Sequence, residues 1–167
     1  VYSKYPEYAV KSKLKKHSEK DDFSPTGFFY VGYEKKDVDF FLDLLIQNHV
    51  QILVDVRSNP FSMNFSFTKT KLSNYLSKSG IEYVLFPELG ISGNYRKKLE
   101  TAEDYAQLFD YYEKQILPNQ NKKFEEILSL GSRKRTALLC FELDQNHCHR
   151  GVLSKKIEKN GFKVKHL

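Results

Sequence analysis

A short run near the carboxyl end of the chain, Cys148-His149-Arg150, combines three side chains that take part in enzyme chemistry. A helix that begins beside this run places its free backbone N–H groups there, which favours an anion. The same surroundings lower the pKa of a thiol, so Cys148 is a candidate nucleophile and His149 its neighbour. Arg150 offers a planar fork of donors to a phosphate or carboxylate. A structural interpretation stays open, in which Cys148 packs, His149 is exposed and Arg150 pairs with an acid such as Asp55.

Cysteine and histidine also bind metal ions, and His147, Cys148 and His149 follow Cys140 in the sequence. Zinc sites favour closely spaced cysteine pairs or histidines repeated on one helix face. Cys140 and Cys148 are separated by seven residues, and adjacent side chains rarely reach the same ion. We therefore expect no metal site and no cofactor.

Arginines are rare in this chain, which has 22 lysines and five arginines. Lysine is its usual positive charge, so an arginine in a loop after an apolar strand or beside a glycine turn indicates a specific contact. Arg57, Arg96 and Arg150 have such positions. Arg57 and Asn59 follow the buried segment 51–56, so each is a candidate ligand contact, while Asp55 is expected to hold the loop.

Two carboxylates, Glu88 and Glu142, follow apolar runs that we expect to be strands. A pair of carboxylates at one edge of a sheet can transfer protons. Each of them can instead neutralise Arg57 or Arg150, and this alternative stays open.

Aromatic side chains accompany these polar groups. Tyr33 follows the first expected strand, and Phe61, Phe65 and Phe67 follow Asn59. Such rings stack on nucleic-acid bases in many binding sites, and they also pack in cores and lids.

The elements that must position these residues alternate between strand and helix. Segments between the apolar runs carry apolar residues at spacings of three and four, which predicts helices, and Pro118 is expected to end or kink one of them. This alternation predicts a single Rossmann-like α/β domain, with a mostly parallel sheet of about five strands and helices on both faces. In such folds ligands bind beyond the carboxyl ends of the strands, where the polar clusters fall. The expected strands are 28–32, 51–56, 83–86, 136–141 and 162–166, and the expected helices begin near residues 37, 68, 101 and 150.

Residues 1–26 are expected to form a basic polar tail and residues 27–167 the α/β domain. The net charge of the chain is +6, and residues 1–20 contribute +4 of it through six lysines and two glutamates. The remaining charge of about +2 does not require a basic surface for nucleic acid. The tail is either a solvated segment or an arm for nucleic acid.

The chain contains no apolar run near the roughly 20 residues that span a bilayer, so we expect no membrane partner. Its beginning lacks the apolar centre of a signal peptide. Two cysteines do not form a disulfide framework, and a reducing cytoplasm is the expected location.

Five motifs, in this order, resemble the domain-of-unknown-function family numbered 488. The resemblance covers about residues 28–167. It implies an α/β domain of bacterial or archaeal proteins and carries no established reaction. After the Asn-Pro pair the family usually has a basic or polar stretch, whereas this chain has the residues 61–65 in the order Phe-Ser-Met-Asn-Phe. The motifs are Val31-Gly32-Tyr33, Leu53-Val54-Asp55-Val56-Arg57-Ser58-Asn59-Pro60, Pro87-Glu88-Leu89-Gly90, Leu138-Leu139-Cys140-Phe141-Glu142 and Cys148-His149-Arg150.

The sequence therefore predicts an enzyme with a phosphate site at the strand ends, acting on a nucleotide or nucleic acid. The alternative is a non-catalytic module that binds a nucleotide or nucleic acid. The candidate catalytic residues are Glu88, Glu142, Cys148 and His149, and the candidate anion-binding residues are Tyr33, Arg57, Asn59 and Arg150.

Overall fold

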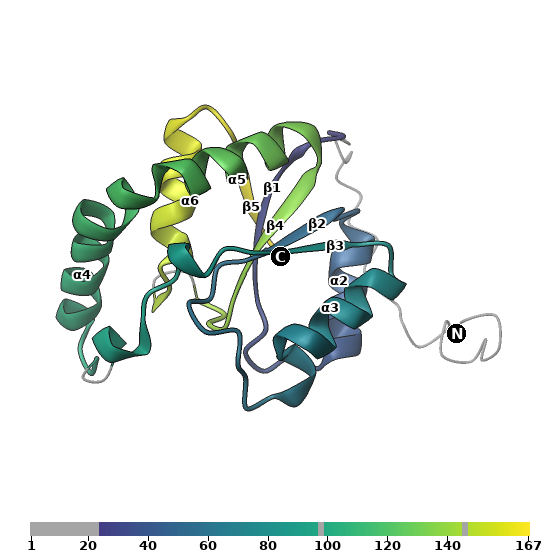
Figure 1. Ribbon diagram of the computed structural model, residues 1–167, viewed down its shortest axis with the longest axis horizontal. Helices are drawn as coiled ribbons and strands as arrows, with labels where there is room; N and C mark the ends of the chain where they lie inside the picture. Colours follow the sequence, from purple (N-terminus) through teal and green to yellow (C-terminus); the bar gives the residue numbers. More distant parts are fainter. Residues whose placement is uncertain (1–23, 97–98, 145–146) are drawn as a thin grey trace.

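The computed structural model describes residues 24–96, 99–144 and 147–167. Residues 1–23, most of the predicted tail, lie outside the described residues. Within the described ranges, parallel strands form one sheet in the order β3-β2-β4-β1-β5 (Figure 1). The strands are β1 (Gly27–Gly32), β2 (Ile52–Asp55), β3 (Glu82–Leu85), β4 (Arg135–Cys140) and β5 (Val164–His166).

Helices cover both faces of this sheet, which confirms the predicted α/β class. Figure 1 shows α2 and α3 on one side of the sheet and α5 and α6 on the other. The helices are α2 (Val38–Gln47), α3 (Lys69–Lys78), α4 (Ala102–Tyr111), α5 (Asn121–Arg133) and α6 (Arg150–Lys159). None of them is long and apolar enough to cross a membrane within the part of the chain that the structure describes.

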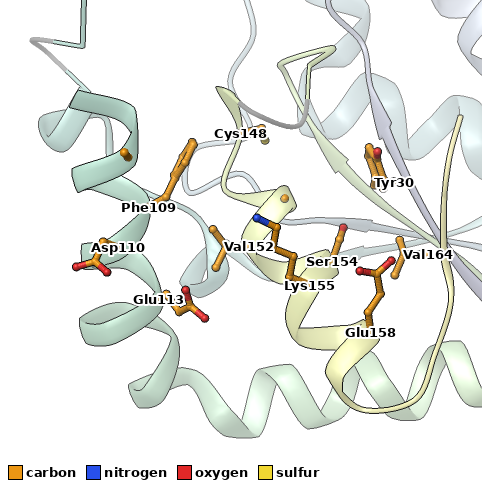
Figure 2. Close-up of a pocket in the computed structure, with 12 residues that line it drawn as sticks. Tyr30, Phe109, Asp110, Glu113, Cys148, Val152, Ser154, Lys155, Glu158 and Val164 are labelled. Atoms are coloured by element: carbon orange, nitrogen blue, oxygen red, sulfur yellow. The ribbon is translucent and has the colours of Figure 1, made fainter. Parts of the chain in front are cut away.

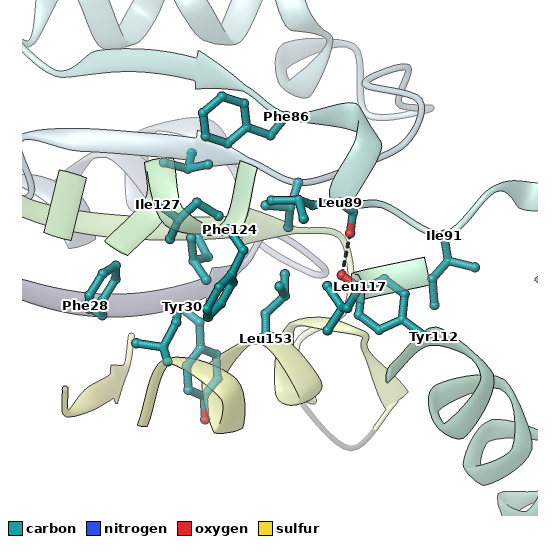
Figure 3. Packing of buried hydrophobic residues seen from close by; sticks show 14 of the residues in the cluster. Phe28, Tyr30, Phe86, Leu89, Ile91, Tyr112, Leu117, Phe124, Ile127 and Leu153 are labelled. Carbon is teal, nitrogen blue, oxygen red and sulfur yellow. Dashed lines mark hydrogen bonds between the residues drawn. The ribbon is translucent and has the colours of Figure 1, made fainter. Parts of the chain in front are cut away.

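The strands read as continuous apolar runs because both of their faces are buried. In β1, Phe28 and Tyr30 face α5 and α6, whereas Phe29 and Val31 face α2 and α3. Figure 3 shows the first of these cores, in which Phe124 of α5 packs near Tyr30. Alternate side chains of every central strand therefore bind the two helical layers to the sheet.

Local signals fix several helix ends. The Asp37 carboxylate accepts a hydrogen bond from the Phe40 amide at 2.7 Å, and Thr101 forms a reciprocal capping box with Asp104. Pro118 does interrupt the helical path, because a π turn (Tyr112–Ile116) and a 3-10 turn (Leu117–Gln120) connect α4 to α5.

Packing and a competing hydrogen bond decide two local details. Phe40 and Phe41 are adjacent apolar residues of α2, and Phe40 is 53% exposed because Phe41 and Leu45 take the inner positions. Thr68 occupies the position before α3, at the predicted helix start, yet its hydroxyl donates to the Phe65 carbonyl at 2.8 Å and does not cap the helix.

The strand order opens a crevice beside the carboxyl end of β4. The chain leaving β1 or β2 crosses to the face of α2 and α3, whereas the chain leaving β4 crosses to the face of α6. Because β4 lies between β2 and β1, the loops separate on both sides of its end. Such a reversal of direction is where open α/β sheets bind ligands. The order differs from the 3-2-1-4-5-6 of the dinucleotide-binding fold.

Candidate functional site

A cavity of about 440 Å³ occupies this crevice, and we call it the strand-end pocket. Tyr33, Arg57 and Cys140, at or just beyond the ends of β1, β2 and β4, contribute to its wall. Asn59, Arg96 and His149 complete its polar lining, together with Ser58, Ser62 and Asn64. The pocket therefore gathers four residues that were predicted from the sequence as site residues: Tyr33, Arg57, Asn59 and His149.

Arg57 is tied to its neighbours by nearly all of its donors. Its guanidinium forms a 2.6 Å ion pair with Asp55, and both side chains are buried. Its Nη1 atom also donates to the Tyr33 hydroxyl at 3.0 Å and to the Phe67 carbonyl at 2.9 Å. Arg57 thus joins the ends of β1 and β2 to the loop before α3, and its role toward an anion stays a prediction.

The Asp55 carboxylate has a second donor. The Tyr83 hydroxyl donates to it at 2.6 Å. Burial raises the pKa of Tyr83, and the Asp55 carboxylate raises it further. Burial opposes the charge of Arg57, but hydrogen bonding and attraction to Asp55 raise its pKa above the ordinary value. Asp55 therefore stabilises a charged network beneath the pocket. Its carboxylate also accepts a hydrogen bond from the Arg57 backbone amide at 3.1 Å, which is the loop-holding role expected from the sequence.

Arg150 is fully buried at the first position of α6. Its Nε donates to the Cys148 sulfur at 3.1 Å, and its Nη2 donates to the Glu142 carbonyl. The Nη1 atom is buried and has no hydrogen-bond partner in the described ranges. In the part of the chain that the structure describes, Asp55 pairs with Arg57 and not with Arg150, and the contacts of Arg150 brace the Cys148 segment against the end of β4.

The amino end of α6 offers few free amides. The Gly151 amide donates to the Cys148 carbonyl at 3.0 Å, and the Val152 amide donates to the His149 carbonyl at 3.1 Å. Local carbonyls therefore already accept hydrogen bonds from these amides. Binding of an anion by this helix end and Arg150 stays a prediction.

Cys140, Cys148 and His149 form a compact group that we call the cysteine cluster. One ligand atom from each lies within 4.8 Å of the other two, and all three residues are buried. The His149 Nδ1 atom is 4.0 Å from the Cys140 sulfur and 3.9 Å from the Cys148 sulfur. The burial of His149 rules out the interpretation in which this ring is exposed.

The two thiols differ in acidity. Burial disfavours ionisation of Cys148, but its hydrogen bond with Cys140 and the adjacent His149 and Arg150 hold its pKa well below the usual range. Contact with Cys148, together with burial, raises the pKa of Cys140 well above the usual range. The Cys140 hydrogen faces two acceptors, Cys148 and the Glu142 carboxylate at 3.1 Å. Cys148 is therefore the more acidic thiol of the pair.

Arg96 also lines the strand-end pocket, although it was not predicted as a site residue. It ends a 3-10 turn (Gly93–Arg96), forms an ion pair with Glu142, and donates from Nη2 to His149 Nδ1 at 3.1 Å. Its side chain is 30% exposed, so it borders both solvent and the cysteine cluster. The signal was present in the sequence as one of the rare arginines, beside Gly93.

The two predicted carboxylates have different positions. Glu142 joins the site through Arg96 and Cys140. Glu88 is exposed in the 3-10 turn after β3 (Pro87–Leu89) and does not line the strand-end pocket. The structure therefore brings Glu142, and not Glu88, to the other predicted residues.

The aromatic residues divide into core and rim. Tyr33 is buried and stacks on Phe67 with ring centroids 4.3 Å apart. Phe61 and Phe141, which also line the pocket, are 67% and 47% exposed. Phe65 is exposed as well and is not a lining residue. Two exposed rings thus border a polar interior.

A glycine permits the close packing of the loop beneath the pocket. A Cβ atom on Gly90 would lie 2.1 Å from the Ser58 amide nitrogen. Ser58 in turn donates from its hydroxyl to the Ile91 carbonyl at 2.8 Å. The motif around Gly90 therefore supports the Arg57–Asn59 loop by direct backbone contact, although Glu88 of the same motif is exposed and does not line the pocket.

A second cavity, of about 580 Å³, lies between α4 and α6, and we call it the helix pocket. Figure 2 shows Asp110 and Glu113 on one wall, Lys155 and Glu158 on α6, and Cys148 at one end. Three carboxylates against one lysine make this cavity acidic. The cysteine cluster therefore separates an acidic cavity from the strand-end pocket, whose lining contains arginines and, among the described residues, no carboxylate.

Sequence comparison supports the motif resemblance. A family model described as domain of unknown function DUF488 matches residues 37–157. The chain belongs to this family. Comparison with curated proteins and with solved structures gave no significant match. The match includes β2, β3, β4 and the whole cysteine cluster, while β1 and β5 lie outside it.

Proposed function

We propose that this DUF488 domain is an enzyme that acts on a phosphate-bearing substrate, a nucleotide or a nucleic-acid end, in the strand-end pocket. The observation that carries the proposal is the shared lining of one pocket by residues from the ends of β1, β2 and β4. Ionisable and nucleophilic groups that meet in a cavity at a reversal of strand order are typical of active sites in open α/β sheets.

The charge of the two cavities favours an anion in this one. Arg57 and Arg96 line the strand-end pocket, and no carboxylate lines it within the described ranges, although each arginine pairs with an acid outside the lining. In the helix pocket the carboxylates outnumber the single lysine. A phosphate would be repelled there, whereas Arg96 and the Asn59 amide can donate hydrogen bonds to it in the strand-end pocket.

The rim supports a planar base as the second part of the substrate. Phe61 and Phe141 are both exposed lining residues, and exposed rings beside a polar interior stack on bases in nucleotide sites. Phe61 begins the segment 61–65, where the family usually has a basic or polar stretch, and it supplies a stacking surface at the rim. Tyr33 and Arg57, which are hydrogen-bonded to each other, line the same pocket.

The reacting groups of the proposal lie at the inner wall. His149 and Cys140 line the pocket, and Glu142 contacts Cys140 and Arg96. Glu142 and His149 are the candidates to transfer protons, and the Cys148 side chain lies behind the lining residues. Arg96 connects the two parts, because it contacts His149 and Glu142 and is exposed to the pocket.

The proposal is tested by calorimetric titration with nucleoside 5′-monophosphates and with the matching nucleosides. Loss of a charge-assisted hydrogen bond costs about 1.5–3 kcal/mol, so Arg96→Gln should weaken monophosphate binding roughly 10- to 100-fold. Nucleoside binding should change little. Arg133→Gln, in an exposed arginine at the far end of α5, is the matched control and should bind as the unchanged protein does.

Mass spectrometry of the same mixtures separates an enzyme from a binding module. Time-dependent conversion of the nucleotide, lost in His149→Asn, supports catalysis. Stoichiometric binding with complete recovery of every nucleotide and oligonucleotide tested would favour the non-catalytic module. Absence of binding by any phosphate-bearing compound would refute both.

A further inference from the structure

We propose that the cysteine cluster binds one zinc ion, or a similar thiophilic divalent cation, through Cys140, Cys148 and His149. The three ligand atoms lie within 4.8 Å of one another. Zinc–sulfur bonds of about 2.3 Å and zinc–nitrogen bonds of about 2.0 Å at tetrahedral angles place sulfur and nitrogen about 3.5 Å apart. The observed separations of 4.0 and 3.9 Å need only a small contraction.

The orientation of His149 suits a metal ligand. Its Nε2 atom faces the Val56 carbonyl at 3.1 Å, and since a carbonyl only accepts, Nε2 carries the ring hydrogen. Nδ1 therefore carries the lone pair of the ring and lies 4.0 and 3.9 Å from the two sulfur atoms. Metal-binding histidines usually donate their other ring N–H to a carbonyl or carboxylate in this way, which fixes the ring.

The sulfur atoms are also supported from outside the cluster. The Arg150 Nε–H group donates to Cys148, and the Glu142 carboxylate contacts Cys140 at 3.1 Å. Coordination requires both cysteines as thiolates, so the Cys140 proton leaves on binding, and Glu142 is placed to accept it. Two thiolates and one imidazole form a donor set that selects zinc over magnesium or calcium.

One existing contact must change when the ion binds. The Arg96 Nη2 group donates to His149 Nδ1 at 3.1 Å, and the metal needs the same lone pair. Arg96 is partly exposed at the pocket, so it can move away from His149 while it keeps Glu142. Three protein ligands leave a fourth coordination position, as in catalytic zinc sites, and Cys140 and His149 both line the strand-end pocket.

This inference goes beyond the proposed function and differs from the expectation of no metal drawn from the sequence. The spacing of Cys140 and Cys148 gave no signal, because their approach depends on how the segment after β4 returns to the sheet. Zinc binding can be measured without any substrate, so failure of nucleotide binding would leave the metal site standing.

The test is a titration of the reduced, chelator-treated protein with Zn²⁺ in competition with a chromophoric chelator, repeated with Co²⁺ as a spectroscopic probe. We expect one zinc per chain and thiolate-to-cobalt charge-transfer absorption. His149→Asn should weaken zinc binding by more than about 100-fold, beyond the 10- to 100-fold typical of groups that only support a ligand. His147→Asn is the matched control, since His147 is 55% exposed and pairs with Asp144.

Alkylation of the unchanged protein gives a readout that does not depend on the folding of a variant. Both cysteines are buried, so their reaction with iodoacetamide should be slow in the metal-free protein. Zinc should slow it further, and removal of zinc should restore the metal-free rate. Absence of stoichiometric zinc binding by the reduced protein would overturn the proposal. Equal losses in the His147 and His149 variants would overturn it as well, as would a protein that forms a Cys140–Cys148 disulfide and takes up no zinc when reduced.

Discussion

Replacement of Asp55 by Asn is the most informative single change beneath the pocket. Asp55 is buried, forms the 2.6 Å ion pair with Arg57, and accepts a 2.6 Å hydrogen bond from Tyr83. Asn preserves the shape of the side chain and removes its charge. Arg57 would then remain buried as a cation without its counter-ion.

The cost follows from that unpaired charge. Loss of one partner of a buried ion pair typically destabilises a protein by about 3–5 kcal/mol. For a urea m-value of about 2 kcal/mol/M, the unfolding midpoint of Asp55→Asn should fall by about 1.5–2.5 M. A second change, Arg57→Gln, removes the stranded cation, so the double variant should be less destabilised than the sum of the single variants.

Urea unfolding of the four proteins in this cycle, followed by circular dichroism, measures the coupling. We expect a coupling free energy of about 2 kcal/mol or more between the two positions. A midpoint shift under about 0.5 M for Asp55→Asn, or strictly additive effects, would refute a structural role for the pair. Arg57 would then be available for an anion.

Three further predictions concern the surrounding elements. Burial and the Asp55 carboxylate raise the pKa of Tyr83, so the folded protein holds this proton more tightly than the unfolded chain does. The stability that this difference contributes is full below the ordinary tyrosine pKa of about 10 and is progressively lost as the pH rises above it. Tyr83→Phe should therefore reduce the fall of the urea midpoint between about pH 9 and pH 11, and an unchanged slope would contradict this. Gly90→Ala places a Cβ atom 2.1 Å from the Ser58 amide nitrogen, so it should destabilise the protein by about 1–3 kcal/mol and weaken nucleotide binding, which thermal unfolding and calorimetry measure. Thr101→Ala removes the capping box of α4 and should cost about 1 kcal/mol in urea unfolding while nucleotide affinity stays the same.

The fold was predictable because its signals are local. Each central strand is a continuous apolar run, and Asp37 and Thr101 mark helix starts by their own hydrogen bonds. Phe40 shows the limit of this reasoning, since two adjacent apolar residues fit the pattern and only packing decides between them. The position of β4 between β2 and β1 depends on long-range pairing that no local pattern encodes.

The site was predictable at the level of loops and less so at the level of contacts. The carboxyl ends of parallel strands share one edge, so the approach of Arg57 to Tyr33 follows from the fold class. The pairing of Arg96 with Glu142 joins residues 46 positions apart, and nothing in either segment specifies it. The approach of Cys140 to Cys148 is likewise a tertiary contact.

The most direct test of the proposed function is a crystal structure of the protein grown with a saturating nucleoside 5′-monophosphate. We predict the phosphate within hydrogen-bond distance of Arg96 in the strand-end pocket and the base against Phe61 or Phe141. A nucleotide bound in the helix pocket or elsewhere on the surface, with the strand-end pocket empty, would contradict the account.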